Sequence, residues 1–107
     1  MMAFTIKQND TSPALQATLK DYADVVISLI GASVRFHMKD LSGSIVIDAP
    51  MTITNASGGV VRYNWQAADT DTAGTYSAEF EVTYSDLSIE TFPNTDNIAI
   101  VITAELN

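Results

Sequence analysis

The chain has no cysteine, and its 107 residues include only 5 basic residues, one histidine and one tryptophan. The lack of cysteine excludes disulfides and thiolate metal sites, and a single histidine excludes a histidine-rich zinc site. No apolar run approaches the roughly 18 residues that a membrane-spanning helix needs. The first residues do not combine a basic start with a long apolar stretch, so the sequence predicts that the chain has no secretory leader and is made in the cytoplasm.

Acidic side chains dominate the charged residues. Thirteen of them give a net charge of −8, which opposes binding to phosphate backbones and to anionic membranes, so we expect neither nucleic acid nor membrane as a partner. Hydrophobic residues make up 47% of the chain, enough to fill one core. The sequence therefore predicts a single domain over residues 1–107.

The most informative segment runs from Tyr76 to Tyr84 because it alternates strictly. Tyr76, Ala78, Phe80, Val82 and Tyr84 share one face, which is the period of a strand with one face on a core. A tyrosine just after a glycine-containing turn resembles the tyrosine corner of immunoglobulin-like domains. The segment predicts that the Tyr76 hydroxyl bonds backbone groups where the chain crosses between sheets.

Turn signals recur at about 8 to 12 residues along the chain, the spacing of a small all-β sandwich. We expect a polar crossover with a helical turn at residues 66–74, and an edge strand before Pro50 because proline limits pairing. The prediction is an all-β, immunoglobulin-like antiparallel β-sandwich of about 7–9 strands. The predicted strands cover residues 4–7, 15–20, 34–39, 44–48, 51–54, 60–65, 76–84, 89–93 and 98–106, and a short β-branched run at residues 25–29 precedes the break at Gly31.

Polar side chains offer few candidates for chemistry. Asp69, Asp71 and Asp96 are expected to form turns and caps, and they would hold a calcium ion only if two loops met. His37 alternates with basic neighbours in mid-strand, which indicates a solvated position. Without a nucleophile paired to a base, a metal cluster or a phosphate loop, we expect no enzyme and no cofactor.

Two further groups of side chains have a structural and a functional reading. Outward acids at Glu79, Glu81 and Glu90 are solvated unless a pocket raises one pKa, as a glycosidase pair requires. Five aromatic residues fall on the core face of their strands, which favours core packing over a carbohydrate platform. These are Tyr63, Trp65, Tyr76, Phe80 and Tyr84.

Phe4, Ile30 and Phe92 are the predicted contact residues. In the simplest register of the last hairpin, Phe92 opposes Glu81 and points outward, whereas a one-residue bulge would turn it inward. Ile30 precedes Gly31 in a turn and is expected to be exposed. We also expect the first and last strands to offer free edges for pairing with a neighbouring chain.

Two positions separate this chain from true immunoglobulin domains: Ala78 and Phe36 stand where those domains carry cysteine and tryptophan. Four stretches give the chain a closer likeness. It resembles the N-terminal module of phage baseplate upper proteins and related small phage tail proteins, roughly over residues 4–103. The stretches are residues 4–11 with 15–19, 29–38, 59–65, and 73–76 with 79–82.

The resemblance implies a non-enzymatic structural protein of a bacteriophage virion. It implies a tail or baseplate component that docks onto other phage structural proteins and is oligomeric in the particle. Two alternatives stay open at this point. One is a capsid decoration protein, and the other is a carbohydrate-binding module that contacts the host surface.

Overall fold

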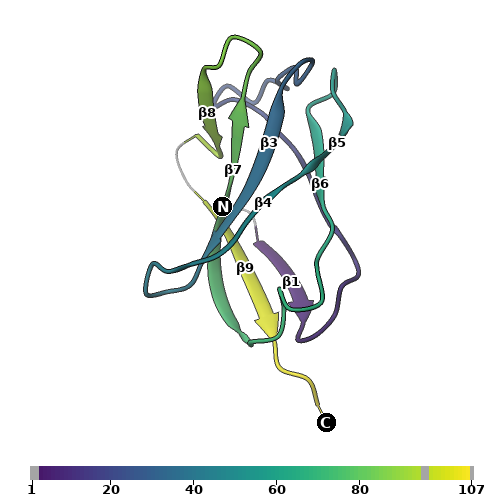
Figure 1. Ribbon diagram of the computed structural model, residues 1–107, viewed down its shortest axis with the longest axis vertical. Coiled ribbons are helices and arrows are strands. Elements are labelled where there is room, and N and C mark those ends of the chain that lie inside the picture. Colours follow the sequence, from purple (N-terminus) through teal and green to yellow (C-terminus); the bar gives the residue numbers. More distant parts are fainter. Residues whose placement is uncertain (1–2, 95–96, 107) are drawn as a thin grey trace.

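The structure is a computed structural model that describes residues 3–94 and 97–106, and it contains strands and turns arranged as two layers (Figure 1). The large sheet has the order β1-β9-β7-β3-β4, with β8 also paired to β7, and the small sheet has the order β2-β6-β5. In this part of the chain the strands are β1 (Ala3–Lys7), β2 (Leu15–Thr18), β3 (Ser33–Lys39), β4 (Ile45–Pro50), β5 (Thr52–Asn55), β6 (Val60–Tyr63), β7 (Gly74–Thr83), β8 (Ile89–Phe92) and β9 (Ile98–Thr103). The predicted all-β sandwich is confirmed.

Aromatic rings join the two layers. Phe36 of β3 is fully buried, and its ring lies 4.6 Å from the ring of Tyr63 in the small sheet. On its own sheet Phe36 neighbours Phe80 of β7, with 6.0 Å between ring centroids. Such offset contacts add to the free energy gained by removing the rings from water. The core therefore lies between the sheets, where the alternation of β7 places its apolar face.

The predicted tyrosine corner is present. The Tyr76 hydroxyl donates a 2.6 Å hydrogen bond to the carbonyl of Thr72, in the connection that crosses from β6 in the small sheet to β7 in the large sheet. The connection expected at residues 66–74 has a hydrogen-bonded turn at residues 67–70 and no helix, and the Asp69 amide donates to the Gln66 carbonyl at 3.0 Å. The Asp69 carboxylate accepts the Gln66 amide at 2.7 Å and holds the turn there.

β7 is the central strand of the large sheet, and residues 77–83 of this 10-residue strand pair with β3 on one side. On its other side, residues 74–78 pair with β9 and residues 80–83 pair with β8. β8 and β9 therefore follow one another along the same edge of β7 (Figure 1).

The sheets differ from the prediction at β9, which runs parallel to β1 and antiparallel to β7. The final strand is thus an inner strand rather than a free edge, and it ends at Thr103 instead of residue 106. Its composition explains this position. Ile98, Ile100 and Ile102 are buried on one face while Val101 is half-buried on the other, as in strands covered by neighbours.

The β-branched run at residues 25–29 does not form a strand. Only an isolated bridge between Lys20 and Val26 remains, because the Asp21 carboxylate turns the chain by accepting the amides of Ala23 and Val25 at 2.9 and 3.0 Å. The β5–β6 hairpin and the edge position of β4 agree with the prediction. No helix among the described residues is long and apolar enough to cross a bilayer.

Candidate functional site

Phe4 is the first of the three predicted contact residues, and it lies on the inner face of β1. Its side chain is half-buried against the core, and its ring stacks on Trp65 with 5.8 Å between centroids and 27° between planes. Phe4 therefore closes the core at the outermost strand of the large sheet. A partner that approaches this strand would contact the exposed part of the ring.

Phe92 points inward, and the prediction that it is exposed is wrong. Its side chain is 2% exposed, and it pairs with Phe80 rather than Glu81. The turn explains the register: Tyr84 donates its amide to the Ser88 carbonyl and accepts the Leu87 amide at 2.8 Å. This makes a three-residue loop in which Leu87, with φ of 71°, takes the position usually held by glycine.

Ile30 is 70% exposed, as the turn around Gly31 predicts. Gly31 has φ of 76°, and a Cβ there would lie 3.4 Å from Cβ of Ser85 in the β7–β8 hairpin. The turn that carries Ile30 therefore packs on the hairpin that carries Leu87, which is 78% exposed. We call Ile30 and Leu87 the apolar end. Sequence reasoning missed Leu87, because it assigned this residue only to a turn.

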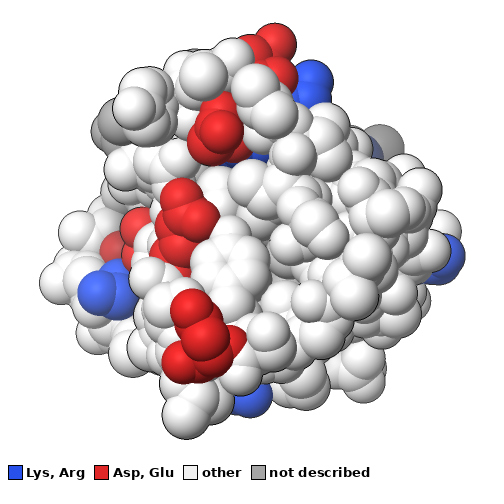
Figure 2. All heavy atoms as spheres, turned by 90° about the horizontal axis from the view of Figure 1, so that it is seen from above, with Lys and Arg blue, Asp and Glu red and all other residues white. Residues whose placement is uncertain are grey.

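Acidic side chains accompany the apolar end. Figure 2 looks onto this end of the molecule and shows Asp and Glu side chains in a band beside a broad uncharged area. Asp86 of the β7–β8 hairpin accepts the Ser88 hydroxyl at 2.6 Å, and this hydrogen bond lowers the pKa of the Asp86 carboxyl. Asp86 therefore stays charged beside Leu87. The end combines exposed apolar side chains with fixed negative charge.

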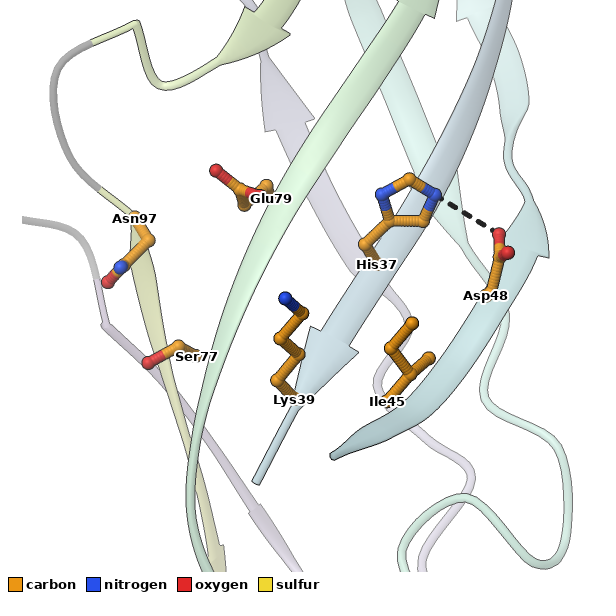
Figure 3. Close-up of a pocket in the computed structure, with 7 residues that line it drawn as sticks. All are labelled: His37, Lys39, Ile45, Asp48, Ser77, Glu79 and Asn97. Atoms are coloured by element: carbon orange, nitrogen blue, oxygen red, sulfur yellow. Dashed lines mark ion pairs between the residues drawn. The ribbon is translucent and has the colours of Figure 1, made fainter. Parts of the chain in front are cut away.

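A second surface feature is a hollow of about 370 Å³ on the outer face of the large sheet (Figure 3). Asp48 lies at its rim, with Nε of Arg35 at 2.8 Å and Nε2 of His37 at 3.1 Å. The Arg35 hydrogen bond is the main reason that the pKa of Asp48 is lowered. The hollow presents side chains of both charges and suits a polar contact. It is lined by His37, Lys39, Ile45, Asp48, Ser77, Glu79 and Asn97.

Of the three aspartates that were considered as calcium ligands, Asp69 and Asp71 each accept a hydrogen bond from a neighbouring side chain. The Asp69 carboxylate accepts the Tyr63 hydroxyl at 2.5 Å and the Gln66 amide, and burial with this bond raises the pKa of Tyr63. Asp71 accepts the hydroxyl of its neighbour Thr72 at 3.0 Å. Asp96 lies outside the described residues. Among those described, no three acidic or histidine side chains form a group that would hold a metal ion.

The positions of the side chains also decide between the structural and functional interpretations of the acidic and aromatic residues. Glu90 opposes Val82 on the inner side and accepts the Tyr84 hydroxyl at 2.7 Å, whereas Glu79 and Glu81 belong to the outer face of β7. The five aromatic residues of the alternative platform lie in or against the core. The expectation that Glu90 points outward into solvent is therefore wrong, whereas the expected packing of the five aromatic side chains in or against the core is confirmed.

These features define a two-layer, immunoglobulin-like β-sandwich that exposes the apolar side chains of Ile30 and Leu87 on two adjacent turns. The sequence matches the family described as BppU N-terminal domain over residues 3–106. The chain therefore belongs to the family of N-terminal domains of baseplate upper proteins, a family of phage baseplate structural proteins. Membership makes the protein a virion component and confirms the resemblance.

Two further comparisons concern the fold. The crystal structure of CopC from Methylosinus trichosporium OB3b is similar with a TM-score of 0.59 and 11% identity, over 100% of this chain and 89% of that chain. At this identity the likeness shows a shared fold alone. No curated protein matches the sequence.

Proposed function

We propose that this protein is a docking subunit of a phage baseplate, which binds neighbouring structural proteins and is present in several copies per particle. The family match over residues 3–106 carries the proposal. The proposed role needs no chemistry at the surface. It needs side chains that lose contact with water when two subunits meet.

The apolar end supports this role. Ile30 and Leu87 are 70% and 78% exposed on two turns that touch each other, and Asp86 stands beside them. Apolar side chains with a polar rim are the usual composition of a protein interface. Ile30 is therefore retained as a contact residue, Leu87 is added, and Phe4 is assigned to the edge strand of the large sheet.

Counting copies in purified particles tests the location. Quantitative mass spectrometry would scale this chain against the major capsid protein, and symmetric assemblies give each location a characteristic number. Copies in the tens or fewer per particle support the baseplate. Copies in the hundreds would instead assign the chain to capsid decoration, and absence from the particle would refute the virion role.

Replacing Ile30 with aspartate tests the contact surface. Ile30→Asp places a charge in the proposed interface and is expected to lower incorporation at least tenfold, while the isolated protein keeps its melting temperature because the side chain is exposed. Leu41→Asp is the matched control, since Leu41 is 81% exposed in the β3–β4 turn. Equal incorporation of both variants would contradict the assignment.

A glycan array with the purified protein tests the carbohydrate-binding alternative. That alternative needs an aromatic pair outside the core, and Tyr22 is the exposed aromatic side chain among the described residues. We expect no glycan to be retained above the background of a Tyr22→Ala variant. Specific retention that Tyr22→Ala abolishes would revive the alternative.

A further inference from the structure

β1 is the outermost strand of the large sheet, and its second side has no strand partner among the described residues. The direction of its backbone groups follows from Gln8, whose amide donates to the Thr103 carbonyl of the β9 side at 2.7 Å. Because backbone groups alternate along a strand, those of Ala3, Thr5 and Lys7 point away from β9. The Lys7 carbonyl accepts the Asp10 amide. The free edge therefore offers the amide and the carbonyl of Ala3, the amide and the carbonyl of Thr5, and the amide of Lys7.

The other outer strands of the large sheet carry features that hinder pairing. β4 ends in Pro50 and has a register shift between Met38 and Lys39 of its neighbour. β8 is followed by Pro93 and carries Glu90 on its inner face. Proline, bulges and inward charges are the devices by which proteins protect sheet edges.

The edges of the small sheet are short or irregular. β5 has four residues and a register shift between Ile53 and Asn55. β2 also has four residues, and the chain just beyond it is bridged from Lys20 to Val26. Short strands give an incoming chain few groups to bind.

β1 has none of these protective features. It is five residues long and regular in register, with Thr5 and Lys7 on the outer face and Phe4 and Ile6 on the inner face. Its single charged side chain, Lys7, points outward. A strand added here would continue both the hydrogen-bond ladder and the inner apolar row. Among the described outer strands, β1 is therefore the one with the longest regular edge.

We infer that β1 accepts an extended segment of a different baseplate subunit as an additional strand of the large sheet. This inference rests on the proposed docking function and names its partner. A second copy of this chain is a poor occupant, because both copies would carry a net charge of −8. Asp10 and Glu105 lie beyond the end of β1, where Asn9 reaches the Glu105 carboxylate at 3.2 Å. The incoming segment alternates apolar with polar residues and carries a basic side chain near this end.

Proline at position 5 tests the edge directly. The Thr5 amide points away from β9, so Thr5→Pro removes a donor from the free edge without removing one from the β1–β9 ladder. Thr5→Val is the matched control, because it keeps the amide and a side chain of similar shape. Both variants would be supplied to a phage that lacks the gene, and copies per particle would be counted by mass spectrometry.

The expected result is incorporation of Thr5→Val at the wild-type level and of Thr5→Pro at one tenth of it or less. Wild-type incorporation of a folded Thr5→Pro variant would overturn the inference and leave the docking function intact. Absence of the wild-type protein from particles would overturn the docking function itself. The two failures are therefore distinguishable.

If Thr5→Pro does not fold, amide hydrogen exchange tests whether the free edge of β1 is paired in the baseplate. In the isolated wild-type protein, the Thr5 amide is expected to exchange much faster than the Phe4 and Ile6 amides, which point to β9. In purified baseplates the Thr5 amide is expected to slow at least tenfold, and an unchanged rate would overturn the inference. Sedimentation of the isolated protein as a dimer that Thr5→Val keeps and Ala3→Pro loses would assign the edge to a second copy instead.

Discussion

At the scale of single residues, Leu87 holds the least favourable backbone conformation for its type. Its φ of 71° lies in the left-handed region, where Cβ crowds the following carbonyl, and its side chain is 78% exposed. Burial does not offset this cost in the isolated protein. An exposed apolar side chain held at such a cost is consistent with a contact role for the apolar end.

Replacing Leu87 with glycine is expected to stabilise the isolated protein by about 1 kcal/mol, because glycine adopts this φ without crowding. Leu87→Ala keeps Cβ and is expected to change the unfolding free energy much less. Denaturant unfolding followed by the fluorescence of Trp65, the one tryptophan of the chain, measures both. Equal stabilities of the two variants would argue against backbone strain.

Replacing Phe92, in contrast to Leu87, is expected to destabilise the protein. Phe92→Ala is expected to cost about 3–5 kcal/mol, because it empties a buried ring position opposite Phe80. Ile89→Ala, at a side chain that is 63% exposed on the same strand, is expected to cost less than about 0.5 kcal/mol. Thermal melts compare them, and a Phe92→Ala variant as stable as Ile89→Ala would place Phe92 outside the core.

At the scale of elements, a hydrogen bond between two titratable side chains, Tyr84 and Glu90, stabilises the β7–β8 hairpin. The Tyr84 hydroxyl donates to Glu90 at 2.7 Å, and burial together with this bond raises the pKa of Tyr84 to about 12. Folding therefore favours the neutral phenol. The stabilisation is complete below the pKa of tyrosine in the unfolded chain and is lost as pH rises toward the folded value.

The unfolding free energy is accordingly expected to fall between about pH 10 and pH 12, and to fall less steeply in Tyr84→Phe. Some decline remains in the variant, because burial also raises the pKa values of Tyr63 and Tyr76. Tyr22→Phe, at an 88% exposed side chain, is the control and is expected to follow the wild type. Matching curves for Tyr84→Phe and the wild type would show that the Glu90 contact contributes nothing.

Elements with strict alternation were predictable from the sequence, and those set by distant contacts were not. β7 and its tyrosine corner follow from residues 72–84 alone, and the exposure of Ile30 follows from the neighbouring Gly31. The β7–β8 register depends on Leu87 adopting a glycine conformation, which no local pattern announces. The parallel pairing of β1 with β9 joins residues almost 100 positions apart in the chain, so turn and strand patterns could not reveal it.

At the scale of the whole molecule, excess negative charge is the dominant electrostatic feature. The net charge is −8, while the ion pairs include an exposed contact between Lys20 and Asp24 at 3.7 Å. Such pairs contribute little, so mutual repulsion among the acids outweighs them.

The melting temperature is therefore expected to rise when sodium chloride is increased from about 10 mM to 150 mM, because salt screens repulsion between exposed charges. Near pH 4 many carboxylates are neutral, and the same salt step is expected to change the melting temperature less. Differential scanning fluorimetry gives both values. A melting temperature that falls with salt at neutral pH would show that ion pairs dominate instead.

The parallel pairing of β1 with β9 also determines how the fold responds to tension. Ala3 begins β1 and Thr103 ends β9, so a pull that separates these two residues slides the strands along each other. Hydrogen bonds loaded in this shear geometry share the force and must break together, whereas an opening hairpin breaks them singly. Forced unfolding is governed by the unfolding rate, so this arrangement gives the domain resistance to stretching that its equilibrium stability does not measure.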